Sequence, residues 1–383
     1  MRSIIENLPG SKIREVANAG IGRNDVLAFW FGESDEPTPA FIRDAAMKSL
    51  GDAETFYAHN LGLPELRDSI ARYVSALHRP LAAARIAVTS SGVNALMLAM
   101  QALAGAGDEV VAVVPVWPNL TAQPEILGAR VTRVPLEVQQ GAWRLDMTRL
   151  LGAVTAETKV LLVNAPNNPT GWTLTAAEQR AILAHCRTTG TWIVADEVYE
   201  RIWFGADAKV APSFLDSAEP DDRLVVVQSF SKSFLMTGWR LGWMVVPETL
   251  TEAIGKLIEF NTSCAPVFVQ RAGVAALAQA DDFVPGLVQR LRTCRDTLLP
   301  RLAALPGVTV ALPEGGMYAF FKVAGQDDSL GFAKRLVVEA GLGLAPGAAF
   351  GAEAEGWLRW CFASRDPKRL EQGVDRLAGF LGL

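Results

Sequence analysis

Short apolar runs that alternate with helical patterns restrict the fold of this chain more than any other feature. Seven runs rich in Val, Ile and Leu have the length of buried strands. They occupy residues 85–89, 109–114, 130–134, 159–163, 191–195, 224–228 and 241–246. Amphipathic or Ala/Leu-rich stretches such as residues 93–104 and 175–188 separate most of them. This alternation predicts an α/β fold, in which helices cover both faces of a mostly parallel seven-stranded sheet.

The pattern changes after about residue 281, where a long helical stretch begins. Strand patterns follow near residues 308–312 and 317–323, and then a helix, a strand and a helix. We expect a smaller α+β domain here, which the N-terminal arm joins. The expected division is residues 1–45 for the arm and part of the small domain, 46–283 for the large domain and 284–383 for the small C-terminal domain.

Composition and charge exclude several classes of protein. With 383 residues, 50% of them hydrophobic and 20% charged, the chain can bury the core of a globular two-domain protein. Its net charge of −5 and the lack of a basic stripe disfavour nucleic acid and anionic membranes as partners. Four widely spaced cysteines, no apolar signal core and no run of membrane-spanning length predict a cytoplasmic protein.

A lysine follows one of the predicted strands. Lys232 comes shortly after residues 224–228, between Ser229 and Ser231 on one side and Arg240 on the other. Its amine can form a Schiff base with an aldehyde cofactor, while the hydroxyls and the guanidinium can hold an anion such as a phosphate. The segment therefore points to a pyridoxal-phosphate enzyme, provided that other strand ends supply the remaining contacts.

Three other strand ends carry suitable groups. Residues 89–96 open a helix whose free amides can cradle an anion, with Gly92 permitting close approach and Ser91 adding a hydroxyl. Trp117 could lie flat against a heteroaromatic ring, and Asn168, in a rigid Asn-Pro turn, could donate to a phenolate oxygen. A serine-capped turn, a core tryptophan and ordinary turn chemistry are the respective alternatives.

Two charged residues lie in or next to apolar strands. Asp196 follows the fifth run, and a buried acid is costly unless it has a partner such as a protonated pyridine nitrogen. Tyr199 could share the phenolate oxygen with Asn168. Arg359 stands in the apolar segment 357–364 and suits a substrate α-carboxylate, which its planar guanidinium can bind in bidentate fashion. A helix-capping aspartate and a structural salt bridge of the arginine are the alternatives.

Taken together and in this order, these motifs resemble the class I/II aminotransferases of the aspartate aminotransferase fold. The resemblance extends from residues 32–39 to Arg359, which is nearly the whole chain. It implies a homodimeric, pyridoxal-phosphate-dependent enzyme that moves an amino group from an L-α-amino acid to a 2-oxo acid by a ping-pong mechanism. Lys232 would hold the cofactor as an internal aldimine and later move the substrate's α-proton.

The resemblance also assigns the other site residues. The implied catalytic residues are Lys232, Asp196 and Tyr199. The implied cofactor contacts are Ser91, Gly92, Val93, Trp117, Asn168, Asp196, Tyr199, Ser229, Lys232, Arg240 and, from the neighbouring subunit, Tyr57. The implied substrate contacts are Gly32, Trp117, Asn168 and Arg359. No metal is implied.

The chain departs from the family pattern at two places. Ser34 stands where many relatives have proline, and Val116 stands where many have an aromatic residue. No second arginine or lysine matches a motif for an acidic substrate side chain. The donor therefore stays open between acidic amino acids and apolar or aromatic ones.

Other functions need motifs that this sequence does not match. A nicotinamide dehydrogenase would need GxGxxG after a strand, but the glycines of residues 20–22 and 341–347 have the wrong spacing. There is no GxSxG elbow for a hydrolase, and His59, His78 and His185 are too dispersed to suggest a metal site. A pyridoxal-phosphate-dependent C–S β-lyase of the same fold would share every cofactor contact, so the motifs leave it open as the alternative.

Overall fold

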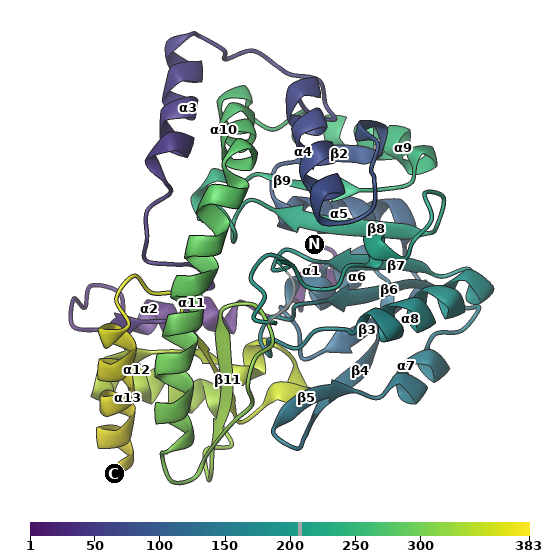
Figure 1. Cartoon of the computed structure of the whole chain (residues 1–383). Coiled ribbons are helices and arrows are strands. Elements are labelled where there is room, and N and C mark those ends of the chain that lie inside the picture. Colours follow the sequence, from purple (N-terminus) through teal and green to yellow (C-terminus); the bar gives the residue numbers. More distant parts are fainter. Residues whose placement is uncertain (206–208) are drawn as a thin grey trace.

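The computed structural model describes residues 1–205 and 209–383 and contains a large sheet of eight strands (Figure 1). The strands follow the order β2-β9-β8-β7-β6-β3-β4-β5. Their bounds are β2 (Ile86–Thr89), β3 (Glu109–Val114), β4 (Arg130–Gln139), β5 (Ala142–Leu145), β6 (Thr158–Asn164), β7 (Trp192–Asp196), β8 (Leu224–Ser229) and β9 (Gly242–Val245). All seven predicted runs are strands of this sheet, and β5 is an additional edge strand.

The sheet is mostly parallel, as the sequence predicts. Strands β4, β3, β6, β7 and β8 pair in parallel, whereas β9 is antiparallel to both of its neighbours and β5 is antiparallel to β4. In the register of β6 and β7, Asn164 lies opposite Asp196, and β8 ends close by at Ser229. The carboxyl ends of these three strands therefore meet at one edge of the sheet, where open α/β sheets bind ligands.

Helices cover both faces because successive strand residues point to opposite sides. Val111 and Val113 of β3 face the side of α4, α8 and α10, whereas Val110 and Ala112 face α5, α6 and α9. The helices of this domain are α4 (Pro64–Leu77), α5 (Gly92–Leu103), α6 (Asn119–Leu127), α7 (Met147–Ala153), α8 (Ala176–Thr189), α9 (Glu248–Glu259) and α10 (Val267–Ala278). Both faces of the central strands are thus buried under helices, which explains their nearly continuous hydrophobic runs.

The smaller α+β part contains a four-stranded antiparallel sheet in the order β10-β11-β14-β13. Its elements are α11 (Ala280–Ala303), β10 (Val308–Val310), β11 (Tyr318–Val323), α12 (Ser329–Ala340), β12 (Leu342–Gly343), β13 (Ala345–Pro346), β14 (Trp357–Cys361) and α13 (Lys368–Leu381). In Figure 1, α11 runs from the level of α10 down to α12 and α13. The expected division at residues 45 and 283 stays a prediction.

The N-terminal arm joins this smaller part through a strand pair. Strand β1 (Leu27–Ala28) pairs in parallel with β12, and α2 (Lys12–Ala19) packs against α12. The arm also includes α1 (Ser3–Glu6) and α3 (Ala40–Gly51). Short 3₁₀ helices are η1 (Ala83–Arg85), η2 (Phe214–Asp216), η3 (Thr237–Trp239), η4 (Gly347–Ala349) and η5 (Ala352–Ala354).

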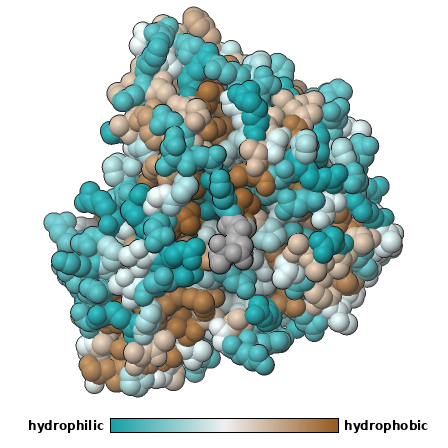
Figure 2. All heavy atoms as spheres, viewed as in Figure 1, coloured by the Kyte–Doolittle hydropathy of each residue, from teal (hydrophilic) through white to brown (hydrophobic). Residues whose placement is uncertain are grey.

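The surface is mostly hydrophilic on the face seen in Figure 2, and hydrophobic residues gather there in separate patches. No helix among the residues that the structure describes combines the length and the apolar composition that crossing a membrane requires.

Candidate active site

A cavity of about 870 Å³ opens at the carboxyl ends of β6, β7 and β8, between the large sheet, the smaller part and the N-terminal arm. It brings together most of the predicted site residues. Those that line it are Gly32, Gly92, Val93, Trp117, Asn168, Asp196, Tyr199, Ser229, Lys232, Arg240 and Arg359. Ser91 is buried and directly precedes Gly92 as the N-cap of α5, and Tyr57 is 90% exposed on the surface. All predicted residues except Ser91 and Tyr57 therefore face one space.

Lys232 is held by the loop that precedes α3. Its Nζ donates a hydrogen bond to the carbonyl oxygen of Gly32 at 2.6 Å and lies 5.6 Å from the centre of the Tyr199 ring. Desolvation in the cavity disfavours the charged amine and lowers the pKa of Lys232 to about 8. A sizeable fraction of this lysine is therefore a neutral amine, the form that reacts with aldehydes and accepts protons.

Asp196 ends strand β7 and is 3% exposed. Its carboxylate accepts a hydrogen bond from the backbone N–H of Val198 at 3.3 Å, and no cation among the described residues lies within salt-bridge distance of it. Burial raises its pKa to about 7. A buried acid that lines a cavity without a cationic protein partner suits a ligand with a protonated ring nitrogen.

The start of α5 forms a cradle of backbone amides. Ser91 caps the helix at φ 119°, and its Oγ accepts a hydrogen bond from the backbone N–H of Asn94 at 3.1 Å. A Cβ added to Gly242 on the neighbouring strand β9 would lie 2.7 Å from the nitrogen of Gly92. Only glycine therefore lets β9 pass behind the cradle, which leaves the helix N-terminus open toward the cavity for an anion.

Two further groups complete this anion site. Ser229 Oγ donates to Ser231 Oγ at 2.9 Å, and the Arg240 guanidinium donates to the carbonyl oxygen of Thr237 at 2.5 Å. Within the described part of the chain, Arg240 forms no ion pair with a carboxylate. An exposed arginine without an acidic partner, at the rim of the cavity beside a helix N-terminus, fits a phosphate group.

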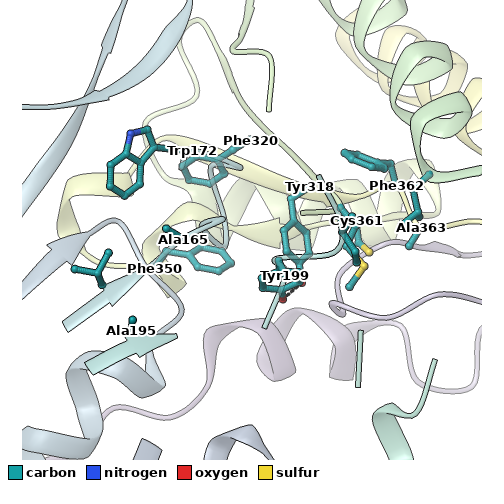
Figure 3. Packing of buried hydrophobic residues seen from close by; sticks show 14 of the residues in the cluster. Ala165, Trp172, Ala195, Tyr199, Tyr318, Phe320, Phe350, Cys361, Phe362 and Ala363 are labelled. Atoms are coloured by element: carbon teal, nitrogen blue, oxygen red, sulfur yellow. Dashed lines mark hydrogen bonds between the residues drawn. The ribbon is translucent and has the colours of Figure 1, made fainter. Parts of the chain in front are cut away.

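Asn168, Tyr199, Tyr318 and Arg359 form one connected group on the other side of the cavity. Tyr199 Oη lies 2.7 Å from Tyr318 Oη, and Asn168 Nδ2 donates to Tyr199 Oη at 3.5 Å. Figure 3 shows the two tyrosine rings next to each other, with Cys361 close by. Burial raises the pKa of both tyrosines, so both keep their protons. One hydroxyl donates to the other, and the second proton is left to donate to an oxygen in the cavity.

Arg359 is almost fully buried in strand β14 and stacks on aromatic rings instead of pairing with an acid. Its guanidinium lies 4.5 Å from the centre of the Tyr318 ring and 4.9 Å from that of Phe350. It donates to Asn168 Oδ1 at 2.9 Å and to the carbonyl oxygen of Trp30 at 2.5 Å, while its buried Nε has no partner among the described groups. Among the described residues Arg359 therefore forms no salt bridge, which was the alternative from the sequence, and the cation can take an anionic ligand.

Sequence reasoning missed Tyr318 and Asn164. Tyr318 fills the space opposite Gly32, where any Cβ would collide with its hydroxyl. Asn164 Oδ1 accepts from the backbone N–H of Asn168 at 2.7 Å, and its Nδ2 donates to the carbonyl oxygen of Asp196 at 3.0 Å. Asn164 could have been found from the sequence, because it is a polar residue at the end of the apolar strand β6. Tyr318 could not, because a tyrosine in an apolar strand looks like any core residue.

Comparisons with known proteins agree with this geometry. A sequence profile of class I and II aminotransferases matches residues 24–377. A probable aspartate/prephenate aminotransferase of Aquifex aeolicus (strain VF5) is 33% identical, over 96% of this chain and 93% of its own length. A solved aspartate aminotransferase from Thermotoga maritima has 32% identity and a TM-score of 0.91, with all of both chains covered. An aromatic aminotransferase structure from Pyrococcus horikoshii OT3 has 28% identity and a TM-score of 0.87, over 96% of this chain and 98% of its own.

The lowered pKa of Lys232 predicts its reactivity. In protein freed of any cofactor, acylation of Lys232 by an amine-reactive reagent should rise with pH around a midpoint of about 8, because the reactive amine is the deprotonated form. Mass spectrometry of the Lys232 peptide measures this rate, and the other lysine peptides of the same sample are the internal control. A midpoint at the ordinary lysine value of about 10.4 would contradict the desolvation of this amine.

Proposed function

Since the chain belongs to the class I and II aminotransferases, we propose that it uses pyridoxal 5′-phosphate, held at Lys232, to move an amino group from an L-α-amino acid to a 2-oxo acid. One observation carries this proposal. A desolvated lysine, a buried carboxylate without a cationic partner and an amide cradle with an unpaired arginine line the same cavity. These are the three partners that an aldehyde, a pyridine nitrogen and a phosphate require.

Each part of the cavity suits one part of the cofactor. When bound, pyridoxal phosphate supplies a ring that accepts electrons from the substrate. Asp196 would keep its ring nitrogen protonated, and Asn168 with Tyr199 would donate to its phenolate oxygen. The amide of Gly92 and the guanidinium of Arg240 would hold its phosphate. The hydroxyls of Ser91 and Ser229, the amide of Val93 and the indole of Trp117 complete the proposed contacts.

Lys232 and Arg359 act on the substrate. The neutral Nζ of Lys232 would take the proton from the substrate's α-carbon, and the carbonyl oxygen of Gly32 orients that nitrogen. Arg359 would bind the α-carboxylate, which every amino acid carries. The stacked rings of Tyr318 and Phe350 hold the guanidinium in place and exclude water from it.

Cationic side chains that line the cavity could recognise the side chain of the amino donor. Lys12 and Arg14 of the N-terminal arm line it, whereas Arg133 is paired with Glu125 and Glu353. We propose that Lys12 and Arg14 are the cations that meet a second carboxylate. Relatives named aspartate aminotransferase favour an acidic donor. The similar structure of an aromatic aminotransferase supports an aromatic donor as the alternative. The aspartate and aspartate/prephenate aminotransferases among the similar proteins support transamination over the C–S lyase.

We further propose a homodimer in the cytoplasm, with active sites shared between subunits. Tyr57 and its neighbour Phe56 are 90% and 84% exposed, and Phe260 is 90% exposed. Large aromatic side chains that stand out of the surface are suited to an interface. The cysteines are unpaired, which supports a reducing compartment.

The stoichiometry of a single half-reaction tests the aminotransferase mechanism. With aspartate, phenylalanine or methionine as the donor and no acceptor, the holoenzyme should release about one 2-oxo acid per subunit and then stop, because the nitrogen stays on the enzyme. Addition of 2-oxoglutarate should restart turnover with ping-pong kinetics. Lys232→Ala is the control and should release none. Continuous formation of ammonia and pyruvate from cystathionine would instead support the lyase.

Replacing Asp196 tests the proposed ring-nitrogen partner. Asp196→Asn keeps the shape but removes the charge that would hold the nitrogen protonated, so kcat should fall by about two orders of magnitude or more. The KM for the donor should change less. Asp375→Asn, at an exposed ion pair with Arg301, is the matched control. Wild-type kcat at full cofactor content in Asp196→Asn would reject this assignment.

Subunit mixing tests the shared sites. Lys232→Ala and Tyr57→Ala proteins should each be strongly impaired, but a mixed dimer contains one site with both native residues. Random exchange of equal amounts should therefore restore about a quarter of wild-type activity, since half of the dimers are mixed and half of their sites are intact. If exchange is verified by mass and activity does not return, Tyr57 does not act across an interface.

A further inference from the structure

His78 lies buried at the end of α4, between two carboxylates. Its side chain is 1% exposed, with Nε2 at 3.1 Å from Glu200 Oε2 and Nδ1 at 2.9 Å from Asp216 Oδ1. Ionised carboxylates only accept hydrogen bonds and a neutral imidazole has one N–H, so with both acids ionised the two contacts are hydrogen bonds when both ring nitrogens carry protons. The geometry therefore describes a buried imidazolium that bridges two acids.

Glu200 belongs to the turn that follows β7, which also carries two proposed site residues. Asp196 and Tyr199 line the cavity. Glu197 points elsewhere and accepts hydrogen bonds from Ser213 Oγ at 2.5 Å and from the backbone N–H of Phe214 at 3.1 Å. The turn thus has a cavity side, with Asp196 and Tyr199, and a rear side, with Glu197 and Glu200.

We propose that the His78 imidazolium is a positioning residue for this turn. By binding Glu200 and Asp216 together, it fastens the rear side of the turn to α4 and η2 and so holds Asp196 and Tyr199 against the cavity. The inference rests on the roles proposed above for these two residues. His78 itself is not among the residues that line the cavity.

The surrounding charges show why the cation is needed. Glu200 and Asp216 contact His78 directly, and Glu197 lies near enough to interact with its charge. The arginines on the outer side already have partners. Arg201 donates to Tyr73 Oη at 3.0 Å and lies 3.5 Å from Asp281. Arg79 lies 3.2 Å from Glu219. Without the imidazolium, the carboxyl groups of Glu197, Glu200 and Asp216 would crowd together with no cation between them, and burial with the charge of Glu200 already raises the pKa of Glu197 to about 8.

The charge on His78 persists over the physiological pH range. Desolvation opposes it, but the hydrogen bonds to Asp216 and Glu200 outweigh desolvation and raise the pKa of the imidazole to about 10. A raised folded-state pKa stabilises the fold fully below the unfolded value of about 6.5. That contribution is lost as the pH rises through about 10.

His78→Gln tests the positioning role in the holoenzyme. The amide can donate to one carboxylate but carries no charge, so kcat at about pH 8 should fall by about 10- to 100-fold, while the KM for the donor stays near wild type because Arg359 is unaffected. Relative to the wild type at the same pH, the loss should shrink as the pH falls below about 8, because the pKa of Glu197 is raised to about 8 by burial and by Glu200, and its neutral form relieves the crowding. His185→Gln, which removes a single hydrogen bond to the carbonyl of Val154, is the matched control.

A second variant separates charge from packing. His78→Gln combined with Glu200→Gln removes one cation and one anion, and the paired amides can still bond to each other. Most of the wild-type kcat at about pH 8 should return in this double variant. If the single variant loses activity equally at every pH and Glu200→Gln restores none of it, His78 is only a packing residue and the inference is wrong.

A measurement on the unmutated histidine keeps the inference testable if these variants do not fold. The chain has three histidines, His59, His78 and His185, so ¹⁵N-histidine spectra of the holoenzyme can be assigned with His59→Gln and His185→Gln. Both ring nitrogens of His78 should stay protonated at about pH 8. A neutral ring at that pH would overturn the inference. This outcome is independent of the Asp196→Asn result, which tests the proposed function itself.

Discussion

The parallel register of β6, β7 and β8 is the constraint on which the site depends. Asn164 lies opposite Asp196 across β6 and β7, and Asp196 lies opposite Val227 across β7 and β8. Three loops therefore start from one edge of the sheet and share one cavity. A shift of one residue in β7 would turn Asp196 to the opposite face of the sheet. Helices pack on both faces of these strands, and a shift would break the close fit between their side chains and those of the strands.

Desolvation in this cavity acts on opposite charges in opposite directions. It lowers the pKa of Lys232 to about 8 and raises that of Asp196 to about 7, so neither group is fully charged near neutral pH. A ligand that offers an aldehyde to the amine and a cationic ring nitrogen to the acid relieves both costs at once. The desolvation of these two groups therefore costs stability in the protein alone, and a bound cofactor that pairs with both would offset this cost.

The sheet strands and the site residues at their ends could be predicted from the sequence, because local patterns encode them. Seven of the eight strands of the large sheet were predicted from their short apolar runs, whereas β5 was missed because its residues alternate between buried Trp143 and Leu145 and exposed Arg144. Site groups at strand ends, such as Asp196, were also predictable. Tyr318 was not, because its partner Tyr199 is 119 residues away and nothing near it in the chain marks its hydroxyl as different from a core tyrosine.

The roles within the segment from Asp196 to Glu200 also depend on contacts that are distant in the sequence. In the sequence the segment is one acidic stretch, and the motif identifies Asp196 and Tyr199 as site residues but assigns no role to Glu197 and Glu200. The fold separates the two pairs by direction, since one pair lines the cavity and the other is buried behind it. Burying the rear pair is costly unless a cation compensates it, and His78 can do so only because α4 ends beside this turn. The arrangement that holds the site is therefore a property of the tertiary structure and has no motif of its own.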